Sequence, residues 1–410
     1  MPTESGTIAT SDRRQLFRAF MKRFNPTAPA RSAFGEGLIC QDSGRSVFRK
    51  LAARADLAIG SQQLVVGGIG SGKTTELLLA ERELSAHEEL LAVYVDVSAE
   101  TDLSAVNSGV LLACLGVRLW DTLVSKFGPP EALSGVYDAI QKAAYGHERL
   151  VLGIEKMTDF TLGGLFHSVS VPGKLATPFP AIQRDVKDLA ESLSKLTSFL
   201  KEKGRELVAI FDGLDRLIKA DQFWSVAEQD LRALRPLEIS VLAAGPLSIM
   251  YGQGRQIKDY FDEAYYLPAA VADPKLSSFL LEILRIRGAE ELMRPERMQR
   301  ICQASGGVLR DLISLARNAG ENAYLDDANK IEAQHVARAV EQLGNSYLLG
   351  LGTRQTTILR NMLAGEGFNP SDSDSMELLV SRRVLEQSES RYEVHPALAS
   401  VLQQIPDAPE

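Results

Sequence analysis

One glycine-rich run of eight residues constrains this chain more than any other feature. The run fits the pattern G-x-x-x-x-G-K-[ST] and reads Gly67-Gly68-Ile69-Gly70-Ser71-Gly72-Lys73-Thr74. An apolar segment at 64–66 precedes it, and a helical pattern at 75–83 follows it. Glycines in this strand–loop–helix context let backbone N–H groups surround a phosphate, and the dipole of the following helix favours negative charge. The run therefore predicts a phosphate-binding loop; the competing interpretation is a glycine-rich turn that binds nothing.

The loop predicts a nucleotide and a metal ion as ligands. Lys73 would reach the β- and γ-phosphate oxygens, and the Thr74 hydroxyl would ligate Mg²⁺. We therefore expect ATP or ADP, together with Mg²⁺, as the cofactors. The loop residues expected to bind the nucleotide are Gly67, Gly68, Ile69, Gly70, Ser71, Gly72, Lys73, Thr74 and Thr75.

A second acidic position is expected at the end of another strand. Residues 207–211 are apolar and Asp212 follows them, which suits a carboxylate that holds the Mg²⁺ shell, usually through water. Gly213 comes next, where many ATPases place a catalytic Glu. Asp215 is the nearest substitute as a general base or water-orienting group, and the alternative is that Asp215 caps the following helix. Without a competent base, hydrolysis would be slow and the protein would act as a switch.

Apolar runs without polar alternation recur between helical patterns in the first two thirds of the chain. They lie at 63–66, 90–96, 207–212, 239–244 and 264–267. Such runs, separated by helix-length segments, indicate a parallel sheet covered on both faces. We predict an α/β fold with a three-layer P-loop NTPase core at 46–268. Residues 153–174 break the rhythm and predict an inserted hairpin or loop.

The segments around this core predict three further parts. The N-terminal extension, 1–45, contains an amphipathic helical pattern at 12–24. After residue 268 the strand signal disappears, and four helical patterns predict a small helical lid domain at 269–344. The remaining part, 345–410, predicts helices at 354–363, 375–383 and 396–404 and a short hairpin at 384–394, which is typical of a winged helix.

The helical pattern at 12–24 has two interpretations. Leu16, Phe20 and Phe24 share one face, so the helix could dock on the main domain. Residues 1–32 hold six basic and two acidic side chains, so the segment could instead be an arm that binds a partner or nucleic acid.

Composition excludes several classes of protein. The 410 residues carry a net charge of −8, which disfavours general binding to nucleic acid. Cys40, Cys114 and Cys302 have no paired spacing, so neither a zinc knuckle nor a disulfide scaffold is expected. No apolar run approaches about 18 residues, and the N-terminus lacks the order of a signal peptide. We expect a cytoplasmic protein with no membrane partner.

The loop and the run ending at Asp212 resemble those of the STAND class of P-loop ATPases, relatives of the AAA+ and origin-recognition ATPases. Residues 305–312, Ser-Gly-Gly-Val-Leu-Arg-Asp-Leu, resemble the start of an AAA+ lid helix, which implies that Arg310 contacts the nucleotide phosphates. Residues 394–398, Val-His-Pro-Ala-Leu, resemble the Met-His-Asp motif of STAND winged helices. That resemblance implies that His395 contacts the β-phosphate of ADP and locks a closed state.

The sequence also departs from this family. The strand at 239–244 lacks the usual polar sensor residue, and Pro396 replaces the acid of the Met-His-Asp motif. The effector and repeat domains that flank a STAND core are missing from the sequence. Two site residues keep alternatives: Arg310 could pair with Asp311 or Asp326, and His395 could be a satisfied buried histidine. Arg184, Arg216 and Arg255 are equal candidates for an arginine finger.

Two functions of different classes follow. The first is a slowly hydrolysing switch ATPase that couples its nucleotide state to conformation, homo-oligomerisation and a separately encoded effector protein; the resemblance implies a bacterial stress or antiviral defence module. The alternative is a DNA-engaging AAA+-type ATPase, similar to initiators or transposition regulators. Residues 346–405 carry five positive and seven negative side chains, which disfavours a DNA-reading winged helix. A nucleotide kinase is a third option, but no second cluster of phosphate-binding arginines supports it.

Overall fold

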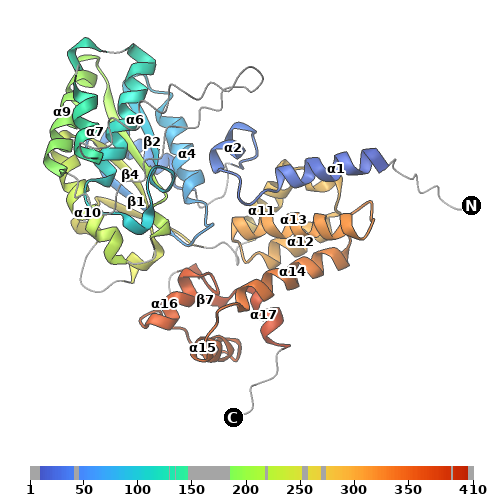
Figure 1. Cartoon of the computed structure of the whole chain (residues 1–410). Coiled ribbons are helices and arrows are strands. Elements are labelled where there is room, and N and C mark those ends of the chain that lie inside the picture. Colours follow the sequence, from blue (N-terminus) through green and yellow to red (C-terminus); the bar gives the residue numbers. More distant parts are fainter. Residues whose placement is uncertain are drawn as a thin grey trace, which may run out of the picture. The chain divides into compact units, whose positions relative to one another are not determined.

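The structure is a computed structural model that describes residues 10–40, 46–128, 130–133, 135–145, 185–217, 220–251, 257–268, 274–388 and 391–404. Contacts within the chain form two compact units (Figure 1). One comprises residues 1–46, 67–75 and 267–410, and the other comprises residues 47–66 and 76–266. We call them the lid unit and the sheet unit. The predicted boundaries at residues 45, 268 and 344 stay predictions, and the insertion predicted at 153–174 lies outside the described residues.

The sheet unit is built on one five-stranded sheet with the order β2-β3-β4-β1-β5. Its strands are β1 (Gln62–Gly67), β2 (Leu90–Asp96), β3 (Glu206–Asp212), β4 (Ser240–Gly245) and β5 (Glu263–Leu267). The pairs β2–β3, β3–β4 and β4–β1 are parallel. Every side chain of β1 and β4 is buried, and since successive side chains point to opposite faces, both faces of the sheet are covered. The predicted α/β fold class is confirmed, and each predicted strand is present within one residue.

The helices around this sheet are α3 (Phe48–Leu57), α4 (Lys73–Leu84), α5 (Val97–Glu100), α6 (Val110–Phe127), α9 (Val186–Glu202) and α10 (Ala220–Leu234), and α7 (Val136–Tyr145) packs on α6 and α9. Short 3₁₀ turns lie at Leu103–Ala105, Glu131–Leu133, Leu214–Arg216, Arg235–Leu237, Leu247–Met250 and Ile257–Asp259. Two buried carboxylates anchor helix starts in this unit. Glu76 accepts hydrogen bonds from the N–H groups of Val47 and Phe48, and Asp230 accepts them from Gly109 and Leu111. Gly116 does not interrupt α6, because its bare backbone lets Ile140 of α7 pack against it.

The lid unit contains a helical bundle around one apolar core. Its helices are α11 (Pro274–Ile286), α12 (Pro295–Ala304), α13 (Leu309–Leu325) and α14 (Ala333–Leu348), with a 3₁₀ turn at Ala289–Glu291. Two N-terminal helices, α1 (Thr10–Arg23) and α2 (Ala30–Gly35), belong to the same unit, and α1 lies along the bundle (Figure 1).

Helix α1 docks on the lid bundle through aromatic side chains. Phe17, Phe20 and Phe24 are buried in the lid core. The ring of Phe20 packs against the backbone of Gly320 in α13, where a side chain would leave no room for it. The Arg13 guanidinium donates to the carbonyls of Tyr324 and Ala328 at 2.8 and 3.1 Å, which satisfies the carbonyl end of α13. The docked arrangement predicted as one alternative is therefore the observed one, with Phe17 rather than Leu16 fully buried, and with the lid as its partner.

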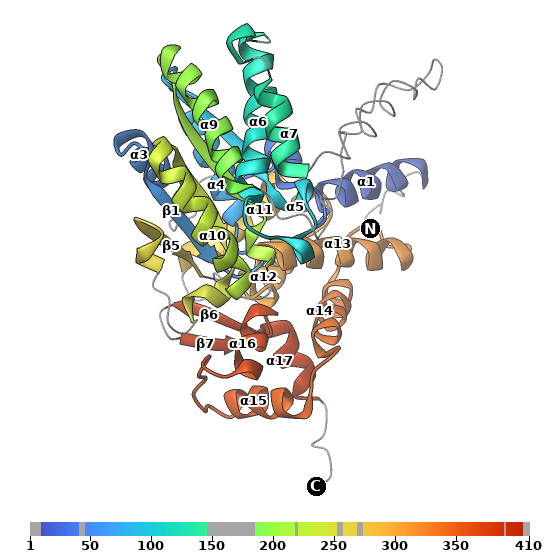
Figure 2. The same ribbon diagram turned by 60° about the vertical axis from the view of Figure 1, so that its left-hand side comes forward.

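A winged helix completes the lid unit (Figure 2). It comprises α15 (Thr353–Leu363), α16 (Ser373–Val380), β6 (Val384–Ser388), β7 (Arg391–Val394) and α17 (Pro396–Leu402), and β6 pairs with β7 in antiparallel orientation. The helix predicted to reach Arg383 ends at Val380. There Arg382 takes a left-handed backbone conformation, φ +66°, and the N–H groups of Arg382 and Arg383 bond to the carbonyls of Leu379 and Leu378. This is a Schellman C-cap, in which a non-glycine residue costs about 1–2 kcal/mol.

A search of the helices in the described residues finds none with the length and apolar character needed to cross a bilayer.

Candidate functional site

The glycine-rich segment forms a tight loop between β1 and α4. Gly70 and Gly72 have φ values of +83° and +105°, in a region of backbone conformation that residues other than glycine rarely adopt. The Ser71 N–H donates to the Gly68 carbonyl at 3.1 Å and closes a turn inside the loop. Left-handed glycines direct successive N–H groups to one side of the backbone, and α4 begins directly afterwards at Lys73. Both features fit a phosphate group.

Lys73 is a buried cation within this loop. Its side chain is 3% exposed, and its Nζ donates to the carbonyls of Gly67 and Gly68 at 2.8 and 2.9 Å. Burying an ammonium group costs free energy unless charge or hydrogen bonds compensate it. A hydrogen bond from an ammonium group to a charged phosphate oxygen is stronger than one to a neutral carbonyl, so a phosphate could displace these carbonyls.

The first turn of α13 contacts the same loop. The Leu309 N–H donates to the Gly70 carbonyl at 3.0 Å. A Cβ atom at Gly70 would lie 3.0 Å from a methyl of Val308 and 3.2 Å from the Cβ of Arg310. The structure therefore places the backbone N and the Cβ of Arg310 beside Gly70, and contact of its exposed side chain with a nucleotide phosphate stays a prediction. Its alternative partners, Asp311 and Asp326, are engaged by other arginines.

Asp212 ends β3 in the sheet unit. It is 4% exposed; its Oδ2 accepts the Tyr94 hydroxyl at 2.5 Å and its Oδ1 accepts the Gly213 N–H at 2.8 Å. The strand register pairs Phe211 with Ala243 of β4, and Ala244 of β4 with Val65 of β1. Asp212 therefore stands at the carboxyl edge of the sheet, level with the end of the strand that runs into the loop.

The sequence analysis missed two neighbours of Asp212. Tyr94 fixes the orientation of the Asp212 carboxylate through its hydroxyl. Asp96, at the end of β2, is paired with Asp212 in the strand register. Asp96 accepts hydrogen bonds from the N–H and hydroxyl of Ser98 at 3.1 and 2.6 Å, so it caps α5. Gly213 passes close by: a Cβ there would lie 2.9 Å from Asp96 Oδ1. The available signal was that β2, like β3, is an apolar run that ends in an aspartate.

Asp215, the predicted base, lies half-buried in the 3₁₀ turn Leu214–Arg216. Because α10 begins only at Ala220, Asp215 is not the cap of that helix. Arg216 is exposed in the same turn, whereas Arg184 and Arg255 lie outside the described residues.

His395 is fully buried between the winged helix and the lid helices. Its Nδ1 accepts the Ala397 N–H at 3.2 Å and caps α17, so in the neutral ring the proton resides on Nε2. Nε2 lies 3.3 Å from Asp311 Oδ2, within ion-pair distance but without hydrogen-bond geometry. One ring nitrogen of His395 is therefore satisfied by a hydrogen bond, and the other faces the Asp311 carboxylate without one. Contact with a β-phosphate stays a prediction, and it would require His395 to leave one of these partners.

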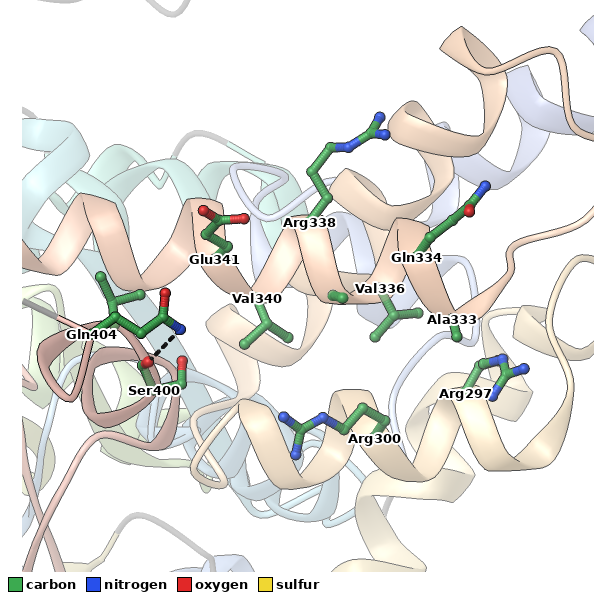
Figure 3. Close-up of a pocket in the computed structure, with 12 residues that line it drawn as sticks. Arg297, Arg300, Ala333, Gln334, Val336, Arg338, Val340, Glu341, Ser400 and Gln404 are labelled. Carbon is green, nitrogen blue, oxygen red and sulfur yellow. Dashed lines mark hydrogen bonds between the residues drawn. The ribbon is translucent and has the colours of Figure 1, made fainter.

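A separate groove of about 710 Å³ lies on the lid unit between α12, α14 and α17 (Figure 3). Val336 and Val340 line it beside the arginines of α12 and α14. Two of these are paired, Arg297 with Glu332 at 3.7 Å and Arg338 with Asp326 at 3.1 Å. Arg300 has no polar partner in the described part of the chain and extends along the groove in Figure 3. The groove is thus a basic surface, distinct from the loop.

Among the described residues, no group of three or more His, Cys, Asp or Glu side chains is arranged to hold a metal ion. Such a group is not required for Mg²⁺ bound with phosphates, which is commonly held by one or two carboxylates together with water and phosphate oxygens.

Comparisons with known proteins return solved structures alone, because no family model and no curated protein matches the chain. The chain is similar to the Aeropyrum pernix ORC2 protein in its ADPNP-ADP complexes, with 16% identity, 94% of this chain and 96% of that chain covered, and a TM-score of 0.48. It is similar to the Aeropyrum pernix ORC1 protein in complex with DNA, with 16% identity, 90% and 94% covered, and a TM-score of 0.43. The Thermotoga maritima RuvB Holliday junction branch migration motor matches with 14% identity, 88% and 95% covered, and a TM-score of 0.40.

Proposed function

We propose that this chain is a nucleotide-dependent switch ATPase. ATP or ADP would bind in the loop at 67–75 with Mg²⁺, and hydrolysis would be slow. The nucleotide state would set the arrangement of the loop, α13 and the winged helix. That arrangement would control homo-oligomerisation and contact with a separately encoded effector protein.

The contact between α13 and the loop carries this proposal. The Leu309 N–H bonds to Gly70, and Leu309 lies 3.3 Å from the position of a Cβ at Gly72. A phosphate in the loop would occupy the N–H side of these same glycines. Any shift of the loop on binding therefore acts on the first turn of α13, which makes the lid responsive to the ligand.

The protein's own residues would bind and orient the nucleotide. Lys73 would exchange its two carbonyl partners for phosphate oxygens, and the N–H groups that begin α4 would add their dipoles. Mg²⁺ would supply a positive charge that neutralises the phosphates. Thr74 would donate a hydroxyl ligand, and Asp212, with its carboxylate oriented by Tyr94, would hold the metal's water shell.

Slow hydrolysis follows from the residue that succeeds Asp212. Gly213 has no side chain that could take a proton, and Asp215 is carried in a separate 3₁₀ turn. Asp215 would orient the attacking water. A weakly placed base prolongs the life of the ATP-bound state, which is useful in a switch. The effector, the oligomer and the stress or defence setting rest on the resemblance to STAND proteins alone.

The direct test measures nucleotide binding and turnover by the purified full chain. We expect Mg²⁺-dependent binding of ATP and ADP, and turnover well below the median enzyme rate of about 10 s⁻¹. Binding can be followed with a fluorescent nucleotide and turnover by phosphate release. Failure to bind either nucleotide at millimolar concentration, with or without Mg²⁺, would contradict the proposal.

A specific surface favours the alternative function, contact with DNA. The outer side of α1 exposes Arg14, Arg18 and Lys22 at intervals of four residues, about 6 Å apart along the helix. Arg14 and Arg18 have no hydrogen bond or ion pair with any described residue, whereas Lys22 lies 3.6 Å from Glu36. Because the three phenylalanines hold α1 on the lid, this stripe is a fixed basic surface suited to a phosphate backbone.

If DNA binds along this stripe, the double variant Arg14→Ala/Arg18→Ala should lose two phosphate contacts. The slope of log affinity against log salt concentration should then fall by about 2, since each contact contributes about 0.9. Fluorescence anisotropy with a labelled duplex measures this slope. The matched control is Arg354→Ala/Arg391→Ala, which removes exposed winged-helix arginines already paired with Asp374 and Glu393. An equal loss of slope in both variants, or no binding by the wild type at low salt, would refute the DNA alternative.

A further inference from the structure

Residues 306–311 contact the phosphate loop on one side and the winged helix on the other. Towards the loop, Val308, Leu309 and Arg310 surround Gly70 and Gly72. Towards the winged helix, Gly306 packs directly against Leu385 of β6, and a Cβ there would lie 3.0 Å from Pro396. All of these residues belong to the lid unit. One short segment therefore connects the two parts that a nucleotide switch would have to couple.

Asp311 forms the polar centre of this connection. It is 3% exposed, and its carboxylate accepts the Tyr347 hydroxyl at 2.6 Å and the Arg382 guanidinium at 3.0 Å, with His395 Nε2 at 3.3 Å. Burial alone would raise the pKa of Asp311, but His395, Arg382 and Tyr347 together hold that pKa below its usual range. Asp311 is therefore a carboxylate that three side chains share, two of them from the winged helix.

Arg382 reaches Asp311 from an unusual backbone position. It is the left-handed residue of the cap that ends α16, where glycine is the common choice. The neighbouring Arg383 donates to the carbonyls of Tyr347 and Leu349, at the end of α14 where the chain leaves the lid helices. A conformation that disfavours arginine is thus kept at the residue that bonds to Asp311, as occurs where a side chain is needed for function.

We propose that Asp311 is a positioning residue that links the placement of the winged helix to the phosphate loop. Asp311 and Leu309 lie in the same helical turn, so a displacement of one moves the other. Arg382 and His395 contact the Asp311 carboxylate of this turn, and the Leu309 N–H bonds to the Gly70 carbonyl and so stabilises the conformation of the loop. In this arrangement His395 acts on the nucleotide through Asp311 and α13 rather than by touching a phosphate. The proposal rests on the proposed function for its ligand.

The test replaces the shared carboxylate and measures the loop. Asp311→Asn in the full chain should weaken ADP binding about 5- to 150-fold, because a loop held less firmly by α13 is less organised for phosphate. Amide hydrogen exchange should rise together in the loop at 68–73 and in α17. A merely structural role would lower the melting temperature but leave the ADP affinity of the folded protein unchanged.

A matched control is available in the same bundle. Asp326 also pairs with an arginine and a histidine, Arg338 at 3.1 Å and His335 at 3.4 Å, but both partners lie on α14. Asp326→Asn should leave ADP affinity and loop exchange unchanged. If Asp311→Asn does not fold, Arg382→Gln provides the second variant. The Arg382 side chain is 20% exposed, so its replacement disturbs the core less, and it removes the same ion pair from the arginine side.

The outcomes separate this proposal from the proposed function. If the wild type binds no nucleotide, the proposed function fails, and the link is judged by exchange alone: the loop and α17 must still respond together. If Asp311→Asn, or Arg382→Gln in its place, frees α17 without changing the loop, or if Asp326→Asn weakens ADP equally, the positioning role is overturned.

Discussion

Replacing Lys73 with Ala should reduce ATP and ADP affinity by roughly 30- to 4,000-fold, and turnover should fall below detection. The reason is that the variant removes the buried cation of the loop, and losing one partner of a buried, hydrogen-bonded charge pair costs about 2–5 kcal/mol. Binding of a fluorescent nucleotide and phosphate release by the full chain measure both effects.

The control for Lys73 must separate loss of the site from loss of the fold. The Lys73 Nζ donates to the carbonyls of Gly67 and Gly68 within its own loop, and a melting temperature within a few degrees of the wild type would show that the variant is folded. Lys195→Ala removes an exposed lysine of α9 paired with Glu191, and it should bind nucleotide normally. Wild-type turnover in the Lys73 variant would show that the loop is a glycine-rich turn without a nucleotide.

Asp212→Asn should keep nucleotide binding within a few-fold and lose Mg²⁺-dependent turnover by at least about 100-fold. The amide is nearly isosteric and can still accept a hydrogen bond from Tyr94 or Gly213, so the end of β3 keeps its shape. Its missing negative charge weakens the hold on the metal's water shell, and the transition-state charge is then poorly neutralised. Phosphate release at several Mg²⁺ concentrations, beside nucleotide binding without Mg²⁺, measures the two effects separately.

Asp96→Asn is the matched control for Asp212, because both residues end neighbouring strands in the same register. The Asp96 carboxylate caps α5, so replacing Asp96 should change the free energy of unfolding by no more than about 1 kcal/mol and leave turnover largely intact. If Asp96→Asn abolishes turnover while Asp212→Asn does not, the acid that serves the metal stands at the end of β2 instead.

Much of the fold was predictable because its signals are local. The strands are mostly apolar, with β1 and β4 buried on both faces, and such runs differ clearly from the amphipathic patterns of α1, α11 and α12. The loop was predictable for the same reason, since the glycines at 70 and 72 and the following lysine are adjacent in the chain. The end of α16 was not predictable, because the helical sequence pattern continues to Arg383 while the backbone at Arg382 takes a left-handed conformation that forms a cap.

By itself the sequence determined the glycine-rich loop between a strand and a helix, the parallel sheet, the acid that ends β3 and the helical bundle with its hairpin-bearing neighbour, since each of these depends on residues close together in the chain. Only the tertiary structure decided which groups share a site. Tyr94 meets Asp212 through strand pairing, across 118 positions of sequence. Arg382 and His395 meet Asp311 because the winged helix packs on α14 and α12 through α17. Such long-range contacts follow from packing and register, and no local pattern encodes them.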